Sequence, residues 1–372
     1  MTAPSPSTSR NPSSGDRMYR YWALGALLLA GISASGCASV GYGFQALAGG
    51  AGILARRAPI ERVLRRPGLP AREREQLELV VALREFSVAE LGLPDNGSYR
   101  SYVRLGRDVV TWNVVAAPAL SVVPVTWCFP VAGCVSYRGY FRERSARRFA
   151  AARARRGEDV AVTGAVAYST LGWFDDPVLD TFLDDEPWRV AGLIFHELAH
   201  QVVYARDDTA FNESFASAVE ELGVERWLAA RGSPAGDGER TAYGRSRSEE
   251  KVFSGLLLAA RSELADLYAS ALPEAEKRAR KRVALDRLAA ALTAALDDGR
   301  LGARHEPWRG HAWNNADLAA VADYTLWVPA LRTLFERSGG FPAFYAAARE
   351  LAGLEAGERR RRLEVLAAAD SG

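Results

Sequence analysis

Apolar positions at helical spacing are concentrated between residues 187 and 230, where they predict two neighbouring helices. The first begins at Pro187, a common residue in a first helical turn, and an apolar run carries it to Tyr204. A short polar segment then interrupts the pattern, and Asp207 or Asp208 can cap the second helix. A connection this short makes the two helices antiparallel neighbours.

Helical periods recur through the rest of the chain. A helix is expected to begin near Asn315, and Pro273 is expected to break the longest helical region. The other helical segments cover residues 60–64, 72–91, 142–156, 248–296 and 341–369. These patterns predict a mainly helical protein.

Two segments are typical of β-strands. Residues 109–125 are rich in β-branched side chains, and Pro118 and Pro124 place that strand at a sheet edge or divide it. Residues 159–174 contain a second strand pattern, which Gly164 breaks. Together with the helices, these segments predict an α+β fold, predominantly helical, with a small mixed sheet beside the helix that begins at Pro187.

The first 36 residues have the features of a leader. Residues 1–17 are rich in serine and proline and are expected to be disordered, and Met18 is an alternative start of translation. A basic residue, a short apolar run and small residues then precede Cys37, which is the pattern of a secretory signal. The apolar run is too short for a comfortable membrane span.

The residues around Cys37 resemble a lipobox, where bacterial lipoproteins are cleaved and acylated. The resemblance implies lipid on the sulfur of Cys37; an ordinary signal peptide or an uncleaved anchor is the alternative. Ala38 is similar to the residues that sort such proteins to the outer membrane. We therefore expect a lipoprotein of a Gram-negative outer membrane, facing the periplasm and contacting the membrane through this lipid.

Beyond the leader, residues 37–372 are expected to form a single domain. Five glycines between residues 38 and 58 predict a flexible tether over residues 37–58. Residues 240–372 are expected to form a helical C-terminal part of the same domain.

Composition fits a globular protein with a full core, because the 372 residues are 48% hydrophobic and 25% charged. The net charge of +2, without a compact basic stripe interleaved with aromatic residues, argues against a nucleic-acid partner. Seven arginines in residues 142–156 predict a solvated helix face more readily than a surface for anionic lipid.

The three cysteines are Cys37, Cys128 and Cys134, too few for a disulfide-framed fold. Cys128 and Cys134 lie six residues apart in a turn-rich segment. In an oxidising periplasm we expect them to form a disulfide, and two buried free thiols are the alternative.

The candidate chemistry lies in His196-Glu197-x-x-His200. Histidines at i and i+4 project from one helix face, so two neutral imidazoles can hold one zinc ion. Glu197 is rotated by about 100° from His196, so it lies beside the metal and can accept the proton of a zinc-bound water. Catalytic zinc sites normally have a third protein ligand. Glu213, about a turn after the bend, should meet His200 across the helix interface and supply it.

These residues resemble the gluzincins of the aminopeptidase N branch, which combine HExxH with a glutamate from the following helix in an Asn-Glu-x-x-Ala setting. The whole mature chain is more closely similar to a family of bacterial lipoproteins described as putative zinc aminopeptidases. The resemblance implies a zincin fold and peptidase activity. It is carried by His196 to Gln201, Asn212 to Ala216, and blocks over residues 93–96, 127–130, 137–141 and 167–174.

Zincins as a class pair the substrate backbone with an edge strand, and residues 165–169 are the candidate here. Ala167, Tyr168 and Ser169 would then contact substrate, although a plain core strand is an equal alternative. Gluzincins also supply a Tyr or His donor to the oxyanion, for which the candidates are Tyr324 and then His311.

Asn314 is a candidate for holding the substrate main chain. For Asn314, His311 and Tyr324, packing or helix capping is the competing interpretation. No carboxylate that orients a histidine can be named, because Ser217, one turn after Glu213, is not an acid.

The function expected is zinc-dependent hydrolysis of peptide bonds, with a peptide or protein as substrate. The resemblance favours an aminopeptidase. The chain lacks a Gly-x-Met-Glu-Asn element for the substrate amine, so an endopeptidase of envelope or misfolded proteins is an alternative. A non-catalytic lipoprotein with a structural zinc is a third hypothesis, against which Glu197 argues, because a structural site has no use for a base.

Overall fold

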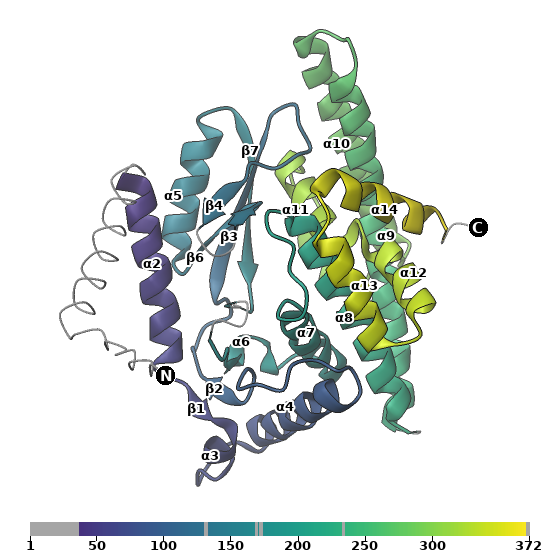
Figure 1. The fold of residues 1–372 in the computed structure, drawn as a ribbon. Coiled ribbons are helices and arrows are strands. Elements are labelled where there is room, and N and C mark those ends of the chain that lie inside the picture. Colours follow the sequence, from purple (N-terminus) through teal and green to yellow (C-terminus); the bar gives the residue numbers. More distant parts are fainter. Residues whose placement is uncertain (1–36, 130–132, 168–169, 171–173, 233–234, 370–372) are drawn as a thin grey trace, which may run out of the picture. The chain divides into compact units, whose positions relative to one another are not determined.

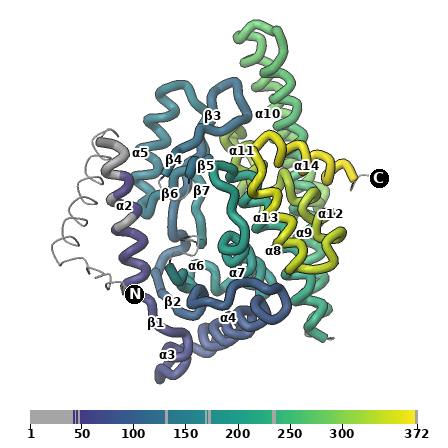
Figure 2. Tube along the Cα trace, in the orientation of Figure 1, coloured from purple at the N-terminus to yellow at the C-terminus, as the bar shows by residue number. Residues whose placement is uncertain are grey.

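The computed structural model describes residues 37–129, 133–167, 170, 174–232 and 235–369 (Figures 1 and 2). The chain divides into a unit that ends at Gly52 and a compact unit from Ile53 onward. The described residues are mainly helical with small sheets, which confirms the α+β prediction.

Helices form most of the compact unit. The α-helices are α3 (Ile60–Leu64), α4 (Ala71–Ala89), α5 (Glu143–Ala154), α6 (Asp180–Leu183), α7 (Pro187–Ala199), α8 (Thr209–Ala230), α9 (Ala235–Ala269), α10 (Glu274–Asp297), α11 (Asn315–Thr325), α12 (Val328–Ser338), α13 (Phe341–Ala352) and α14 (Ala356–Ala368). A 3-10 helix, η1 (Ala303–Trp308), precedes α11. The predicted break at Pro273 and the predicted helix start near Asn315 are confirmed, because α10 begins directly after Pro273 and α11 begins at Asn315.

Strands within the described residues form three small sheets. The sheets have the orders β1-β2-β8, β6-β3-β7 and β4-β5. The strands are β1 (Ala58–Pro59), β2 (Ser101–Val103), β3 (Thr111–Pro118), β4 (Trp127–Phe129), β5 (Gly133–Val135), β6 (Tyr137–Tyr140), β7 (Glu158–Ala165) and β8 (Val178–Leu179). The predicted small mixed sheet corresponds to β1-β2-β8, which combines antiparallel and parallel neighbours, while the other two sheets are antiparallel.

The sheet β6-β3-β7 is antiparallel, and α5 covers one face while α11 covers the other (Figure 1). Strand β3 ends at Pro118, as the missing N–H of proline predicts. Strand β7 continues through Gly164 and ends at Ala165, so the predicted break is wrong. The reason is local packing: a Cβ at Gly164 would lie 2.9 Å from a methyl carbon of Val109, so the neighbouring segment fills the space of a side chain. Residues 166 and 167 are not part of the strand, and residues 168 and 169 lie outside the described residues.

Helices α7 and α8 lie side by side at the centre of the helical layer, with α4 against α7 and α11 and α12 against α8 (Figure 1). Phe195 on α7 and Phe211 and Phe215 on α8 are fully buried in the main core. Helices α9 and α10 pair along their length and form a second core with η1 and α11. The helix pair α7–α8 is therefore braced on several sides.

Residues 37–54, for which the glycines predicted a flexible tether, form helix α2 (Cys37–Leu54). Each glycine costs a helix only about 1 kcal/mol relative to alanine. The alanines, leucines and aromatic residues between them still allow continuous helical hydrogen bonding. No helix in the described part of the chain combines the length and the apolar character needed to cross a membrane. The leader, residues 1–36, lies outside the described residues.

Candidate metal centre

Helix α7 brings the two histidines to its C-terminal end. It ends at Ala199 with His200 as its C-cap, so the predicted continuation to Tyr204 is wrong. The next backbone N–H groups bond three residues back, from Gln201 to Leu198 (3.1 Å) and from Val202 to Ala199 (2.9 Å). Tyr204 therefore lies beyond the helix, in a connection whose apolar side chains are buried by tertiary packing.

The connection to α8 is fixed by polar side chains. Asp208 is the N-cap and accepts a hydrogen bond from the backbone N–H of Phe211 (3.0 Å), which confirms one of the two predicted caps. The buried amide of Asn212 accepts from the N–H of Ala205 (2.7 Å) and donates to its carbonyl (2.8 Å). These two hydrogen bonds to Ala205 fix the start of α8 against the segment that follows α7, directly before Glu213.

The structure brings His196, His200 and Glu213 together. An Oε2 atom of Glu213 lies 3.3 Å from Nε2 of His196 and 3.6 Å from Nε2 of His200. The two imidazole rings are nearly perpendicular, with their centroids 5.0 Å apart. All three side chains are buried, and one ligand atom from each lies within 4.8 Å of the others. This arrangement can hold a metal ion.

The hydrogen-bonding pattern fits a bound cation. Nδ1 of His196 lies 3.1 Å from Oε2 of Glu220, a carboxylate that can only accept, so Nδ1 carries the proton and Nε2 of the neutral ring presents a lone pair to Glu213. Two hydrogen-bond acceptors, each with a lone pair, then face each other at 3.3 Å in a buried site. A proton or a metal ion must lie between them, and two imidazole nitrogens with one carboxylate oxygen form a typical catalytic zinc donor set.

Without a metal, protons take that place. Burial lowers the pKa of His196, but the hydrogen bonds to Glu213 and Glu220 outweigh burial, and the pKa is raised well above its usual value. Burial opposes ionisation of Glu213, yet the neighbouring imidazoles lower its pKa strongly. The site therefore stabilises a positive charge, either a proton or a metal ion, between the imidazoles and the carboxylate.

Glu197 lies on the helix position next to His196 and is half-buried. Burial first, and then the negative charge of Glu197, raises the pKa of Tyr99. The same charge contributes to the raised pKa of Tyr324. The charge of Glu197 therefore raises the pKa of tyrosines from two separate segments, and Tyr324 is also a neighbour of the triad.

Tyr99 is a site neighbour that the sequence did not indicate. It is buried and has a positive φ of 60°, which is unusual for an aromatic residue. Its N–H donates to the carbonyl of Asp176 (2.7 Å), and the buried guanidinium of Arg84 holds the carbonyl of Ser98 (3.0 Å). The surrounding segment thus enforces the strained backbone. The only signal in the sequence was that Tyr99 follows the block over residues 93–96.

Tyr324 is placed beside the triad. Its ring stacks on that of His196, with centroids 6.1 Å apart and planes at 22°. The charge of Glu213 raises its pKa well above the usual value although Tyr324 is 41% exposed, and the phenol keeps its proton at neutral pH. The Ser214 hydroxyl donates to the carbonyl of Asp323 (3.1 Å) and accepts from the N–H of Trp327 (3.2 Å). These bonds tie the end of α11 to α8.

Asn314 and His311 are placed elsewhere. Asn314 forms a capping box with Asp317 at the other end of α11, about 15 Å along the helix axis from Tyr324. His311 lies between Trp308 and Trp313 and 3.2 Å from the Asp317 carboxylate. The structure therefore gives Asn314 the capping role, and it separates both residues from the triad. Sequence proximity to Tyr324 was misleading because the helix carries the chain away.

The predicted strand residues are only partly described. Ala167 follows the end of β7 and is half-buried, and Tyr168 and Ser169 lie outside the described residues. The neighbouring edge strand β7 pairs with β3 along its length, as described for the sheet.

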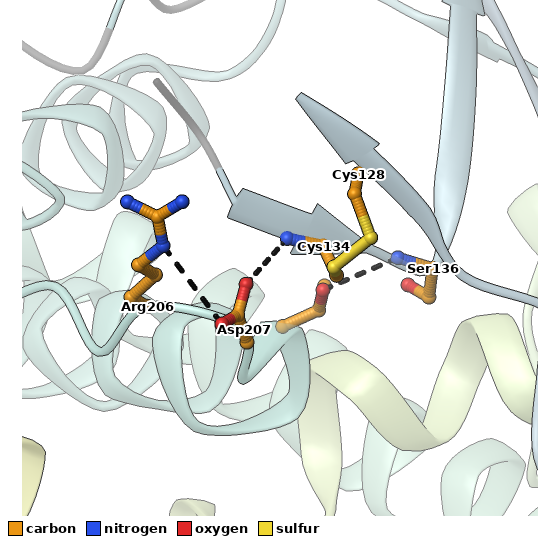
Figure 3. Close-up of a disulfide and its surroundings, with 6 residues drawn as sticks. Cys128, Cys134, Ser136, Arg206 and Asp207 are labelled. Carbon is orange, nitrogen blue, oxygen red and sulfur yellow. Dashed lines mark hydrogen bonds and ion pairs between the residues drawn. A yellow bond between two sulfur atoms is a disulfide. The ribbon is translucent and has the colours of Figure 1, made fainter. Parts of the chain in front are cut away.

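The predicted disulfide between Cys128 and Cys134 is confirmed, and it closes the ribbon β4–β5 (Figure 3). The ribbon docks on the α7–α8 connection, where the Cys134 N–H donates to the Asp207 carboxylate (2.6 Å) and the Ser136 N–H to the Thr209 hydroxyl (3.3 Å). The Ser136 hydroxyl donates to Asp323 (2.5 Å) on α11. The ribbon thus joins the turn before Glu213 to the helix that carries Tyr324.

Comparison with known proteins identifies a family match. Residues 41–363 match the model of a protein family that is described as "Putative aminopeptidase". No curated protein and no solved structure matches the chain.

Proposed function

Because the chain belongs to the "Putative aminopeptidase" family, we propose that it is a zinc-dependent peptidase that removes residues from the free amino end of peptides. The observation that carries the proposal is the buried triad of His196, His200 and Glu213, with Glu197 on the adjacent helix position. A carboxylate next to two metal-ligating histidines is the arrangement of a hydrolytic site, since a purely structural zinc is normally closed by a fourth protein ligand.

The triad would hold the ion through Nε2 of both histidines and the Glu213 carboxylate. When bound, zinc supplies a Lewis acid that polarises the scissile carbonyl and lowers the pKa of water. Glu197 accepts a proton from the attacking water on its carboxylate and then delivers that proton to the nitrogen of the leaving amine. The Tyr324 hydroxyl, which keeps its proton at neutral pH, donates a hydrogen bond to the developing oxyanion.

We also propose that the protein is exported and carries lipid on Cys37, at the periplasmic face of an outer membrane. The signal pattern before Cys37 supports the proposal, and so does the Cys128–Cys134 disulfide, because such bonds persist in oxidising compartments. Mass analysis of the purified protein from bacterial membranes tests it. We expect a chain that begins at Cys37 with attached acyl groups; an unmodified Cys37 would contradict the proposal.

The experiment that tests the activity compares wild-type protein with Glu197→Gln. We expect the variant to keep its zinc and to lose peptide hydrolysis by at least about 10²-fold, because the base is removed while the ligands stay. Glu225→Gln on α8, an exposed residue that pairs with Arg332, is the control and should retain activity. Zinc-loaded wild-type protein that hydrolyses no peptide would contradict the proposal.

The substrate class is tested with matched peptides that carry a free or an N-acetylated amino end. An aminopeptidase cleaves the free peptides from the amino end and leaves the acetylated ones intact. Equal cleavage of both sets, at internal bonds, would identify an endopeptidase instead.

A further inference from the structure

Glu220 is the acidic hydrogen-bond partner of His196, which was not predicted from the sequence. It follows Glu213 by seven residues, or two helical turns, so both carboxylates lie on the face of α8 that meets α7. Glu213 reaches Nε2 of His196 at 3.3 Å, and Glu220 reaches Nδ1 of the same ring at 3.1 Å. One imidazole is thus held at both nitrogens by two turns of one helix.

Gly192 provides the space in which Glu220 lies. It precedes His196 by one turn on α7, and a Cβ built there would lie 3.0 Å from Oε1, 3.1 Å from Cγ and 3.4 Å from Cδ of Glu220. Contacts of 3.0–3.4 Å are tighter than most real Cβ contacts, so a Cβ here would push the Glu220 side chain away by a few tenths of an ångström. The glycine costs the helix about 1 kcal/mol relative to alanine, and this close approach explains its presence.

The neighbouring residue fixes the rotation of α8. Glu221 is buried and bonds Arg247 (2.6 Å) on α9 and Arg332 (3.2 Å) on α12. Because these bonds hold Glu221 toward α9 and α12, the adjacent Glu220 is turned toward α7. His200 has no matching partner, since its Nδ1 has no hydrogen bond within the described residues. The orienting carboxylate therefore serves the first histidine.

We propose that Glu220 is a positioning residue for the metal centre, and that Gly192 is the residue that admits it. Glu220 accepts the Nδ1 proton of His196, which fixes the tautomer and the ring orientation that present the Nε2 lone pair toward Glu213. A charged acceptor on Nδ1 also makes Nε2 a more basic ligand. This inference rests on the proposed function, because it concerns the affinity of the triad for zinc.

The test is the zinc affinity of metal-free protein, measured by competition with a chromophoric chelator. We expect Glu220→Gln and Gly192→Ala each to weaken zinc binding by about 10- to 100-fold, the range found for partners of metal-ligating histidines. Two matched controls should bind like wild type. Gly244→Ala removes a helical glycine with open space around it, and Glu225→Gln removes a carboxylate with exposure similar to that of Glu220.

The double variant Gly192→Ala/Glu220→Gln shows whether the two residues act through one bond. We expect it to bind zinc no more weakly than Glu220→Gln alone, because both substitutions remove the same hydrogen bond to Nδ1 of His196. Losses that multiply would show that Gly192 acts independently of Glu220 and would overturn the pairing.

The tautomer can be followed directly by nitrogen NMR of labelled histidines, since the chain has only four. In the zinc-loaded wild type we expect His196 to carry its proton on Nδ1, and we expect Gly192→Ala to change that signal. Wild-type protein that binds no zinc would contradict the proposed function. Tight wild-type binding with unchanged affinity and spectra in both variants would overturn this inference alone.

Discussion

One oxygen of Glu213 lies within hydrogen-bonding or near-contact distance of both histidines, 3.3 Å from His196 and 3.6 Å from His200. Its negative charge is also the first cause of the raised pKa of Tyr324. A single carboxylate therefore contributes to cation binding and also raises the pKa of the tyrosine beside it. Single substitutions around it should separate metal binding from catalysis.

Tyr324→Phe should lower kcat by about 10²- to 10³-fold while zinc content stays at the wild-type level, because the variant loses one hydrogen-bond donor to the oxyanion and keeps every ligand. Steady-state kinetics and metal analysis measure the two effects. Tyr268→Phe, which removes a hydroxyl bonded to Asn315 (2.9 Å), is the control. Wild-type kcat in Tyr324→Phe would exclude the donor role.

Asp323 should make stability depend on pH. Burial is the main cause that raises its pKa from 3.8 to about 7, against the hydrogen bond from Ser136, and the charge of Glu213 adds to it. The folded state thus binds this proton more tightly than the unfolded chain does. The associated stability is complete below about pH 4 and is lost as the pH rises through about 7.

Asp323→Asn stays neutral, so its free energy of unfolding should exceed that of wild type by a margin that grows between pH 4 and pH 7. Urea unfolding at pH 5 and pH 8 measures the margin, and we expect a gain on the order of 1–3 kcal/mol at pH 8. The exposed Asp286→Asn is the control. A margin that does not change with pH would show that Asp323 is ionised in the folded protein throughout.

Helical geometry explains which residues of the site could be predicted from the sequence. His196, Glu197 and His200 were predictable because i to i+4 spacing is a local property, and Glu213 because a short connection leaves few ways to pack two helices. Glu220 was not predicted because Ser217, one turn after Glu213, is not an acid, whereas the acid that bonds His196 lies two turns after Glu213. Tyr99 was missed because a positive φ is enforced by tertiary contacts.

At the scale of elements, the disulfide ribbon β4–β5 links the parts of the site. Its Cys134 N–H bonds to Asp207 in the α7–α8 connection (Figure 3). The residue that follows the ribbon, Ser136, bonds to Thr209 at the start of α8 and to Asp323 on α11. The sequence predicted the disulfide from compartment and spacing. It could not predict where the ribbon docks, because that depends on contacts between residues more than 70 positions apart.

Gly133→Ala should destabilise the ribbon and its docking. Gly133 has a φ of 73°, and a Cβ there would clash with the Asp207 carboxylate. We expect a loss of about 1–3 kcal/mol from the strained backbone, with a further loss from the clash. Gly157→Ala has a similar φ of 78° and open space, so it measures the backbone cost alone. Equal losses of thermal stability in both variants would show that the contact with Asp207 contributes nothing.

Element boundaries were the least predictable feature of the fold. The apolar residues after His200 continue the helical pattern, yet α7 ends at Ala199 because tertiary packing buries them in turns. Gly164 likewise lies inside β7, where Val109 takes the place of a side chain. In both cases periodicity reports burial correctly, but the backbone conformation is decided by neighbours that are distant in sequence.

At the scale of the whole molecule, the described residues from Ile53 onward share one compact unit in which α7 and α8 are surrounded by other helices. The mainly helical α+β class was predictable, because it depends on the summed pattern of many segments. Helix α2 was not, since glycine content favoured a flexible segment. A ligand that binds across α7 and α8 should therefore stabilise the entire unit.

Zinc should raise the free energy of unfolding by about 3 kcal/mol when its free concentration is 100 times the dissociation constant, because only the folded chain assembles the triad. Thermal unfolding with zinc and with a chelator measures the difference. Glu213→Ala removes a ligand, so the same additions should leave its transition nearly unchanged. An equal zinc response in both proteins would place the binding elsewhere.

The most direct test of the metal centre is a crystal structure of the zinc-loaded protein with anomalous data at the zinc edge. We predict one strong peak within about 2.0–2.2 Å of Nε2 of His196, Nε2 of His200 and a carboxylate oxygen of Glu213, with Glu197 beside it and not bound to it. The absence of a peak at these three side chains, or a Glu213 carboxylate turned away from both rings, would contradict the account.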